Sequence, residues 1–230
     1  MNRDAVSAAV LAGGMSKRMG VDKATLRIVD NGPTMIDLVV QALERVSDDV
    51  LIIGTGRGDL AELFHGRVRV IPDAYPGTGP LGGIATAVAA ARHERCCVVA
   101  CDLPFLNAEL LATMIDADPS SDVTIPALAG TSRQGGTTVY QTLHALYSKR
   151  ALPLMERALR EGRNQVIGWF PEARVRPMGE VDVRAIDPNL LSCFNVNTKE
   201  ALSTVRDGLA NGSFSLTDEP TGVVTEERSQ

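Results

Sequence analysis

The feature that most constrains this chain is the regular alternation of short apolar runs with amphipathic helical patterns. The runs have the length of buried strands, and the segments between them repeat apolar residues at three- and four-residue spacing. Such alternation is typical of a mostly parallel sheet with helices on both faces. We therefore predict an α/β fold made of a single three-layer domain with a mostly parallel sheet. The predicted strands are residues 5–11, 50–54, 68–71, 96–100 and 122–128.

The helical patterns complete this organisation up to residue 130 and weaken beyond it. Predicted helices cover residues 33–46, 59–64, 80–93, a segment capped by Asn107, 151–162 and 198–209. In the weaker region, residues 137–147 are interpreted as a strand that runs into a helix, and a last strand is expected at 193–196. We place one domain at residues 1–210. The polar and acidic residues 211–230 are expected to form a poorly ordered tail.

Composition excludes several classes of protein. The net charge of −5 leaves no basic excess for a nucleic-acid backbone, and aromatic residues are only 4% of the chain. The N-terminal apolar run is too short to span a membrane. Neither a nucleic-acid nor a membrane partner is therefore expected. The cysteines form no pair of Cys-x-x-Cys motifs and suit small buried thiols in a reducing compartment, so we predict a cytoplasmic protein. They are Cys96, Cys97, Cys101 and Cys193.

The first predicted strand ends in Gly13 and Gly14, and Lys17, Arg18 and Lys23 follow within ten positions. Alone, two glycines after a strand indicate a tight turn, and the cations are typical of a solvated charge cluster. Together they suit a polyphosphate, because glycine lets backbone N–H groups approach an anion while Arg and Lys neutralise its charge. The spacing matches neither a Walker loop nor a dinucleotide fingerprint.

Polar residues also follow three other predicted elements. Asp73 and a glycine-rich run follow the third strand, Asp102 follows the fourth, and Asn195 and Asn197 precede the last helix. Each has a structural alternative as a turn or cap residue. Because ligands of open parallel sheets gather beyond the carboxyl ends of the strands, their joint occurrence favours one shared crevice. A carboxylate such as Asp102, facing phosphates, is also a typical ligand of Mg²⁺.

No activated nucleophile is apparent in the sequence. The histidines His65, His93 and His144 lie away from the strand ends, and no Ser–His–Asp or Cys–His pattern emerges. Transfer to an acceptor that is already an ionised phosphate needs neither nucleophile nor base, since charge neutralisation and in-line positioning do the work.

The segment "LAGGMSKRMGVDKA" resembles the signature of nucleotidyltransferases that act on sugar phosphates and small cofactors. Together with "DAYPGTGPLGGI", "ACDLPFL" and "FNVNTKEAL", the chain most resembles the molybdenum cofactor guanylyltransferases, a Rossmann-like family. The matching motifs run from residue 11 to about residue 202. The stretch after Lys23 is longer than the family pattern, and the region 130–190 matches it only in part. Because the region 130–190 is expected to determine the acceptor, the resemblance defines the identity of the acceptor less well than that of the nucleotide.

The resemblance implies three sets of site residues. The implied nucleotide-binding residues are Leu11, Ala12, Gly13, Gly14, Lys23, Asp73, Gly79, Pro80, Leu81, Gly82 and Asp102. The implied catalytic residues are Arg18, Lys23 and Asp102, of which Asp102 ligates Mg²⁺. The implied acceptor-binding residues are Asn195 and Asn197. Lys17 gains no role and is interpreted as a surface charge.

The implied reaction is attack by the molybdopterin phosphate on the α-phosphorus of GTP, with release of pyrophosphate. The second glycine of "LAGG" favours guanine over cytosine. Two alternatives stay open: a related enzyme that uses CTP or a different phosphorylated acceptor, and a regulatory nucleotide-binding module without catalysis. The resemblance also leaves room for contact with other molybdenum cofactor biosynthesis proteins or a target-enzyme chaperone.

Overall fold

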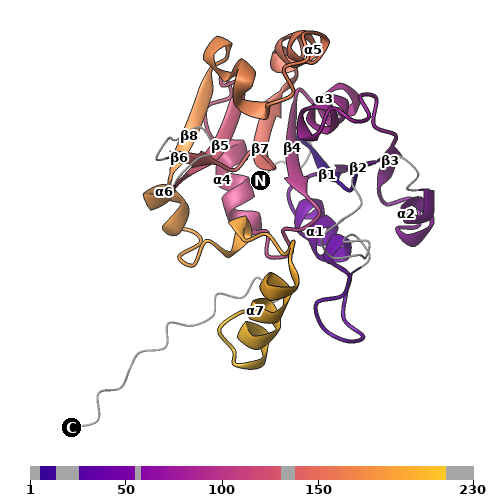
Figure 1. Ribbon diagram of the computed structural model, residues 1–230, viewed down its shortest axis with the longest axis vertical. Helices are drawn as coiled ribbons and strands as arrows, with labels where there is room; N and C mark the ends of the chain where they lie inside the picture. The colour runs from indigo at the N-terminus through magenta and orange to yellow at the C-terminus, as the bar shows by residue number, and fades with distance from the viewer. Residues whose placement is uncertain (1–5, 14–25, 55–57, 131–137, 216–230) are drawn as a thin grey trace.

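The computed structural model describes residues 6–13, 26–54, 58–130 and 138–215 (Figure 1). The strands are β1 (Ser7–Leu11), β2 (Asp49–Ile53), β3 (Arg69–Ile71), β4 (Arg95–Ala100), β5 (Val123–Ala129), β6 (Thr138–Tyr140), β7 (His144–Ser148) and β8 (Val175–Gly179). The α-helices are α1 (Met35–Glu44), α2 (Gly58–Leu63), α3 (Pro80–Ala90), α4 (Ala108–Asp116), α5 (Leu152–Arg160), α6 (Glu180–Arg184) and α7 (Lys199–Ala210). Three 3₁₀ turns are η2 (Lys149–Ala151), η3 (Val166–Glu172) and η4 (Leu191–Cys193).

These strands form one sheet in the order β3-β2-β1-β4-β7-β5-β6, with β8 paired to β5 (Figure 1). The pairs β1–β2, β2–β3, β1–β4 and β5–β8 are parallel, whereas β7 runs antiparallel to both β4 and β5. From the central β1 the chain moves outward through β2 and β3, then returns to form β4 on the other side of β1. A ligand site is expected at this reversal of direction.

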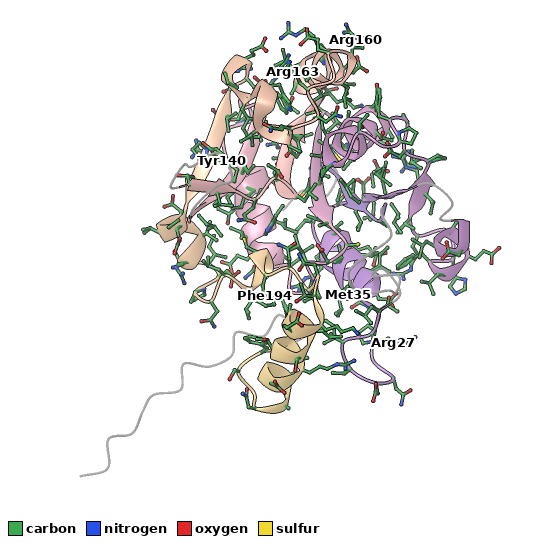
Figure 2. All side chains as sticks on the ribbon, viewed as in Figure 1. Arg27, Met35, Tyr140, Arg160, Arg163 and Phe194 are labelled. Carbon is green, nitrogen blue, oxygen red and sulfur yellow. The ribbon has the colours of Figure 1, made fainter. Side chains whose placement is uncertain are left out.

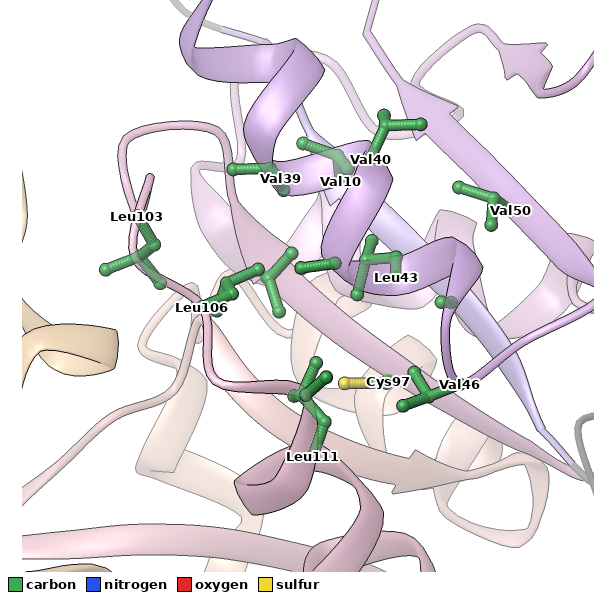
Figure 3. Packing of buried hydrophobic residues seen from close by; sticks show 14 of the residues in the cluster. Val10, Val39, Val40, Leu43, Val46, Val50, Cys97, Leu103, Leu106 and Leu111 are labelled. Carbon is green, nitrogen blue, oxygen red and sulfur yellow. The ribbon is translucent and has the colours of Figure 1, made fainter. Parts of the chain in front are cut away.

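Two apolar clusters cover the two faces of the sheet. Successive residues of β1 point to opposite faces, so Val10 joins the cluster under α1 and α4, while Ala9 joins the one under α3 and α5. Figure 3 shows Val10 and Val50 against the apolar side of α1. The predicted three-layer α/β fold with a mostly parallel sheet is confirmed.

Local capping sets the start of α4 as the sequence predicts. The Asn107 side-chain oxygen accepts hydrogen bonds from the backbone N–H groups of Glu109 (2.8 Å) and Leu110 (3.1 Å). These donors have no partner inside the helix, so the cap stabilises its first turn. In the described part of the chain, no helix has both the length and the apolar character needed to cross a bilayer.

Two sequence interpretations are wrong beyond residue 130. Residues 137–147 hold no helix in their described part: they form β6 and β7, whose backbone groups pair across to β5 and β4. Residues 193–196 are not a strand either. They leave the 3₁₀ turn η4, and the Val196 N–H donates to the carbonyl of Asp102 at 2.8 Å instead of to a neighbouring strand. The short β8 and α6 were not predicted.

The C-terminal helix α7 lies off the sheet, on a third, smaller cluster. Its apolar side chains Leu202 and Val205 pack there with Ile28, Met35 and Val196. Figure 1 shows α7 apart from the strands, beside the loop that leads into α1. Residues 211–215 continue from α7, and Phe214 packs on this cluster. The predicted domain end at residue 210 stays a prediction, and residues 216–230 lie outside the described part.

Candidate functional site

A cleft of about 630 Å³ opens at the carboxyl ends of β1, β2 and β4. On one side it is lined by Leu11, Gly13, Ile53, Gly54, Asp73, Pro76, Gly77, Gly79, Pro80 and Gly83. On the other side it is lined by Ala100, Cys101, Asp102, Leu143 and Asn195. The cleft lies where the chain direction reverses around β1, and the three predicted strand exits at Gly13, Asp73 and Asp102 meet in it together with the Asn195 segment.

Backbone hydrogen bonds beyond the strands fix the floor of the cleft. The Ala12 N–H donates to the Ile53 carbonyl at 2.9 Å, and the Gly54 N–H donates to the Ile71 carbonyl at 3.1 Å. Gly13 lies against Gly54, since a Cβ built on Gly13 would be 3.9 Å from the Gly54 Cα. The two glycines leave a flat slot beside the ends of β1 and β2, in which a planar ring can approach the backbone.

A glycine turn leads into the start of α3 at the edge of the cleft. Gly77 and Gly79 have φ angles of +82° and +73°, which side chains rarely adopt. Gly79 is the N-cap of α3 and supplies no side-chain cap, and Pro80 begins the helix. The first-turn N–H groups of a helix lack intrahelical partners and favour anions. The amino-terminal end of α3 therefore suits a phosphate or another acidic group.

Asp73 both caps this turn and lines the cleft. Its Oδ1 accepts hydrogen bonds from the Tyr75 N–H at 2.9 Å and from the Thr86 hydroxyl at 3.1 Å. The Thr86 hydroxyl also accepts from the Ala74 N–H at 3.1 Å. The turn interpretation of Asp73 is thus correct, and the binding interpretation stays compatible with it, because Oδ2 makes no hydrogen bond to a described residue.

Asp102 stands at the tip of β4 beside the segment that carries Asn195. The hydrogen bond from the Val196 N–H to the Asp102 carbonyl joins these two segments directly. Among the residues that the structure describes, no three His, Cys, Asp or Glu side chains gather into a metal-binding group. A carboxylate in a cleft suits Mg²⁺, which takes one or two carboxylates together with phosphate oxygens and water.

The other predicted site residues are placed less directly. The Ala12 and Leu81 side chains are buried in the two sheet cores. Gly82 faces the glycine turn, since a Cβ on it would lie 2.7 Å from the Tyr75 carbonyl oxygen. Asn197 is half-buried and does not line the cleft. The predicted residues Gly14, Arg18 and Lys23, as well as Lys17, lie outside the described residues.

Sequence reasoning missed the lining residues Ile53, Gly54, Cys101 and Leu143. A signal existed for Gly54, because it ends the apolar run of β2 as Gly13 ends that of β1. Leu143 offers no such signal. It reaches the cleft at the break between β6 and β7, which both run antiparallel to β5, and its carbonyl accepts from the Ala100 N–H of β4 at 2.9 Å.

A buried His–Cys contact lies behind the Asn195 segment, although no such pattern was expected. The Nδ1 atom of His144 is 3.7 Å from the Sγ atom of Cys193. Burial lowers the pKa of His144 to about 4 and raises the pKa of Cys193 to about 12. Both groups are therefore neutral near pH 7. An activated thiolate has its pKa shifted the opposite way, so the pair is no nucleophile.

Comparison with known proteins places this arrangement among nucleotidyltransferases. Residues 8–173 match the family model described as the MobA-like NTP transferase domain. A molybdenum cofactor guanylyltransferase from Desulfosudis oleivorans is 35% identical over 92% of this chain and 100% of its own length. A probable molybdenum cofactor guanylyltransferase from Pelotomaculum thermopropionicum is 36% identical over 86% of this chain and 90% of its own.

Solved structures share the fold. Molybdopterin-guanine dinucleotide biosynthesis protein A from Archaeoglobus fulgidus superposes with a TM-score of 0.73 at 23% identity, covering 89% of this chain and 99% of that one. A 4-diphosphocytidyl-2C-methyl-D-erythritol synthase from Anaerococcus prevotii gives 0.65 at 15% identity, covering 91% and 97%. The second likeness shows that the same fold occurs in an enzyme named for a different product.

Proposed function

This chain belongs to the MobA-like NTP transferase family, and we propose that it transfers GMP from GTP to the phosphate of molybdopterin, forming the guanine dinucleotide cofactor and releasing pyrophosphate. The proposal is supported by relatives of that name that align over their full or nearly full length. The observation that carries it is that Gly13, Gly79, Asp73, Asp102 and Asn195 line one cleft together.

The two sides of the cleft divide the substrates between them. The glycine slot of Gly13 and Gly54 takes the guanine nucleoside, with Asp73 beside it, and the start of α3 faces its phosphates. The opposite side, formed by Asp102, Leu143 and Asn195, takes the acceptor. We propose that Asn197, two positions after Asn195 in the same segment, also binds the acceptor.

A divalent metal is general among nucleotidyltransferases, and we propose Mg²⁺ here. Asp102 would hold it, since its carboxylate is at the strand tip in the cleft and further oxygens would come from the phosphates. When bound, the ion supplies neutralisation of phosphate charge. Arg18 and Lys23, which follow Gly13 in the sequence, are proposed to bind the triphosphate.

The chemistry of the transfer needs positioning more than proton transfer. An oxygen of the acceptor phosphate forms a bond to the α-phosphorus of GTP, and the bond from that phosphorus to the oxygen of pyrophosphate breaks. The attacking oxygen is already ionised, so no side chain has to remove a proton. The neutral His144–Cys193 pair behind the cleft is consistent with a reaction that uses no base.

We also propose a cytoplasmic location. All four cysteines, each of them described, are free thiols, which suits a reducing compartment. Contact with other molybdenum cofactor biosynthesis proteins or with a target-enzyme chaperone stays a prediction.

The test is a transfer assay with the purified protein, Mg²⁺, molybdopterin and either GTP or CTP, in which pyrophosphate and the dinucleotide are measured. We expect product with GTP and little with CTP. Turnover with CTP alone would overturn the guanine assignment. Tight nucleotide binding without turnover on any acceptor would support the regulatory module instead.

Two variants test the proposed roles within that assay. Asp102→Ala and Lys23→Ala should each lower turnover by about a hundredfold, the usual cost of one lost electrostatic contact to the transition state. Lys17→Ala is the matched control for Lys23 and should keep the wild-type rate. Near-wild-type rates in both test variants would contradict the metal and phosphate roles.

A further inference from the structure

The small C-terminal cluster, formed by residues of 26–38, Phe105, 194–196 and α7 with Phe214, contains parts of two segments that border the cleft and of the segment that begins at residue 26. Phe105 follows Asp102 by three positions, Phe194 and Val196 flank Asn195, and Leu26 and Ile28 follow the lysine-bearing stretch. Figure 2 labels Phe194 and Met35 where α7 meets the rest of the molecule. The Asp102 and Asn195 segments therefore leave the cleft and enter the same cluster, which the segment from residue 26 also joins.

The Arg206 side chain of α7 binds the backbone of the segment that begins at residue 26. The Arg206 Nε donates to the Ile28 carbonyl at 2.7 Å, and an Nη atom of Arg206 donates to the Arg27 carbonyl at 3.4 Å. Hydrogen bonds from a charged donor are among the stronger ones in proteins. They attach α7 to the segment that begins at residue 26, three positions after Lys23 in the sequence.

Phe214 closes the other end of the cluster. Its N–H donates to the Gly208 carbonyl at 3.0 Å, which turns the chain back over α7. Its ring then packs edge-on against Phe105, with ring centroids 5.7 Å apart. Gly208 is needed for this return, because a Cβ on Gly208 would overlap the Phe214 ring.

We propose that Phe214 is a positioning residue for the transfer reaction: packed on Gly208 of α7, it holds Phe105 and thereby the Asp102 loop and the Asn195 segment in their mutual placement. The link between these two segments is the hydrogen bond from the Val196 N–H to the Asp102 carbonyl at 2.8 Å. The effect on turnover rests on the proposed function, whereas the effect on this hydrogen bond does not.

The substitution Gly208→Ala separates positioning from plain stability. Alanine favours a helix more than glycine does, so α7 itself should form more readily. The new methyl group displaces the Phe214 ring. We expect Gly208→Ala, Phe214→Ala and the double variant to lower kcat by a similar factor of about ten, because small misplacements of reacting groups cost rate steeply. If kcat of the double variant is no lower than kcat of either single variant, both substitutions break the same contact. The Kd for GTP should change by less than about twofold, since the nucleotide side is not displaced.

Amide exchange of Val196 gives a readout that is independent of activity. In Phe214→Ala and Gly208→Ala the Val196 N–H should exchange at least about tenfold faster than in the wild type, whereas the Leu110 N–H at the start of α4 should be unchanged. A chain ending at Ser215 should behave as the wild type, and one ending at Ala210 as Phe214→Ala.

The outcomes decide between the alternatives. Full activity and unchanged Val196 exchange in Gly208→Ala would overturn the proposal, even if Phe214→Ala lowered the melting temperature. An inactive wild type would contradict the proposed function alone, because the exchange measurements would still test the role of Phe214.

Discussion

A single buried hydroxyl holds the nucleotide side of the cleft in shape. The Thr86 Oγ1 accepts from the Ala74 N–H at 3.1 Å and lies 3.1 Å from Asp73 Oδ1 and 2.9 Å from the Gly82 carbonyl oxygen. One side chain of α3 thus connects the helix to the turn that carries Asp73. A carboxylate that is held on one oxygen presents the other in a fixed direction, which is what recognition of a nucleoside requires.

Thr86→Val keeps the shape of the side chain and removes these hydrogen bonds. Loss of the hydrogen bonds that the Thr86 hydroxyl makes to the Ala74 N–H and to Asp73 should cost about 1 kcal/mol of unfolding free energy. A less constrained Asp73 should raise the Kd for GTP by about tenfold while kcat at saturation changes little. Urea unfolding and calorimetric GTP binding measure the two effects.

Thr113→Val is the matched control for that substitution. Thr113 is exposed on α4, and its hydroxyl makes the same type of bond, to the Glu109 carbonyl at 2.9 Å. It should leave both stability and GTP binding near wild type. Equal effects of the two valine substitutions would show that Thr86 contributes only through its hydrogen bond within α3, and not through its bonds to the Asp73 turn.

Another residue-scale effect concerns pH. Burial lowers the pKa of His144 to about 4, whereas the unfolded chain has its ordinary value near 6.5. The unfolded state therefore binds a proton first as the pH falls, and stability decreases from about pH 6.5 down to about pH 4, by up to about 3 kcal/mol. Unfolding of wild type and His144→Gln by urea at several pH values checks this. The variant should lose most of the slope in that window, and exposed His65→Gln should keep it.

At the scale of elements, a brace formed by Asp49, Ser7 and Arg69 joins three strands at their amino-terminal ends, opposite the cleft. Asp49 begins β2 and accepts from the Ser7 hydroxyl of β1 at 2.6 Å. Its carboxylate also binds the Arg69 guanidinium of β3 with two bonds, at 2.8 and 2.9 Å. One buried carboxylate thus joins the first residues of three parallel strands. Burial alone would raise the pKa of Asp49, but hydrogen bonds from Ser7, the Arg92 N–H and Arg69 together lower it below its ordinary value.

This brace predicts a second, more acidic transition. A carboxyl with a lowered pKa stabilises the fold above its ordinary pKa and loses that contribution as the pH falls through about 4 and below. Asp49→Asn should lower the unfolding free energy at pH 7 by about 2 kcal/mol or more, since Arg69 loses a buried partner. The difference from wild type should shrink toward pH 3. Asp48→Asn, at a neighbouring half-exposed carboxylate, should have a smaller effect; an equal loss would contradict the brace.

How far the sequence predicts the elements depends on how each strand is stabilised. β1, β2 and β4 are buried on both faces, so their apolar runs alone reveal them, and parallel order follows from the helices between them. β8 contains Arg176 and Pro177 and lies at an edge, so its sequence lacks an apolar run, although it pairs with β5 throughout. Residues 193–196 are apolar enough for a strand but find no strand partner. The cleft follows the same rule: Gly13, Asp73 and Asp102 each come two positions after a predicted strand, whereas Leu143 depends on the long-range pairing of β6 and β7 with β5 and β4.

At the scale of the whole molecule, stability is unevenly divided between the sheet and α7. The two large clusters bury both faces of the sheet, whereas α7 rests on the small cluster beside it. Regions with few buried apolar contacts open at a lower free energy than the global unfolding reaction. The segment that carries Asn195 enters this less stable part, so the acceptor side of the cleft should be more easily opened than the nucleotide side.

Native-state hydrogen exchange in low denaturant tests this division. Amides of α7 should exchange through a partial opening, with a free energy below that of the central amides of β1 and β4. Because the small cluster joins the segment that follows the proposed phosphate-binding residues Arg18 and Lys23 in the sequence to the Asn195 segment, saturating GTP should slow α7 exchange by mass action on the closed state. Exchange of α7 and β1 at one common free energy would instead show a single cooperative unit. A partial opening that GTP leaves unchanged would show that nucleotide binding and acceptor binding are not coupled through α7.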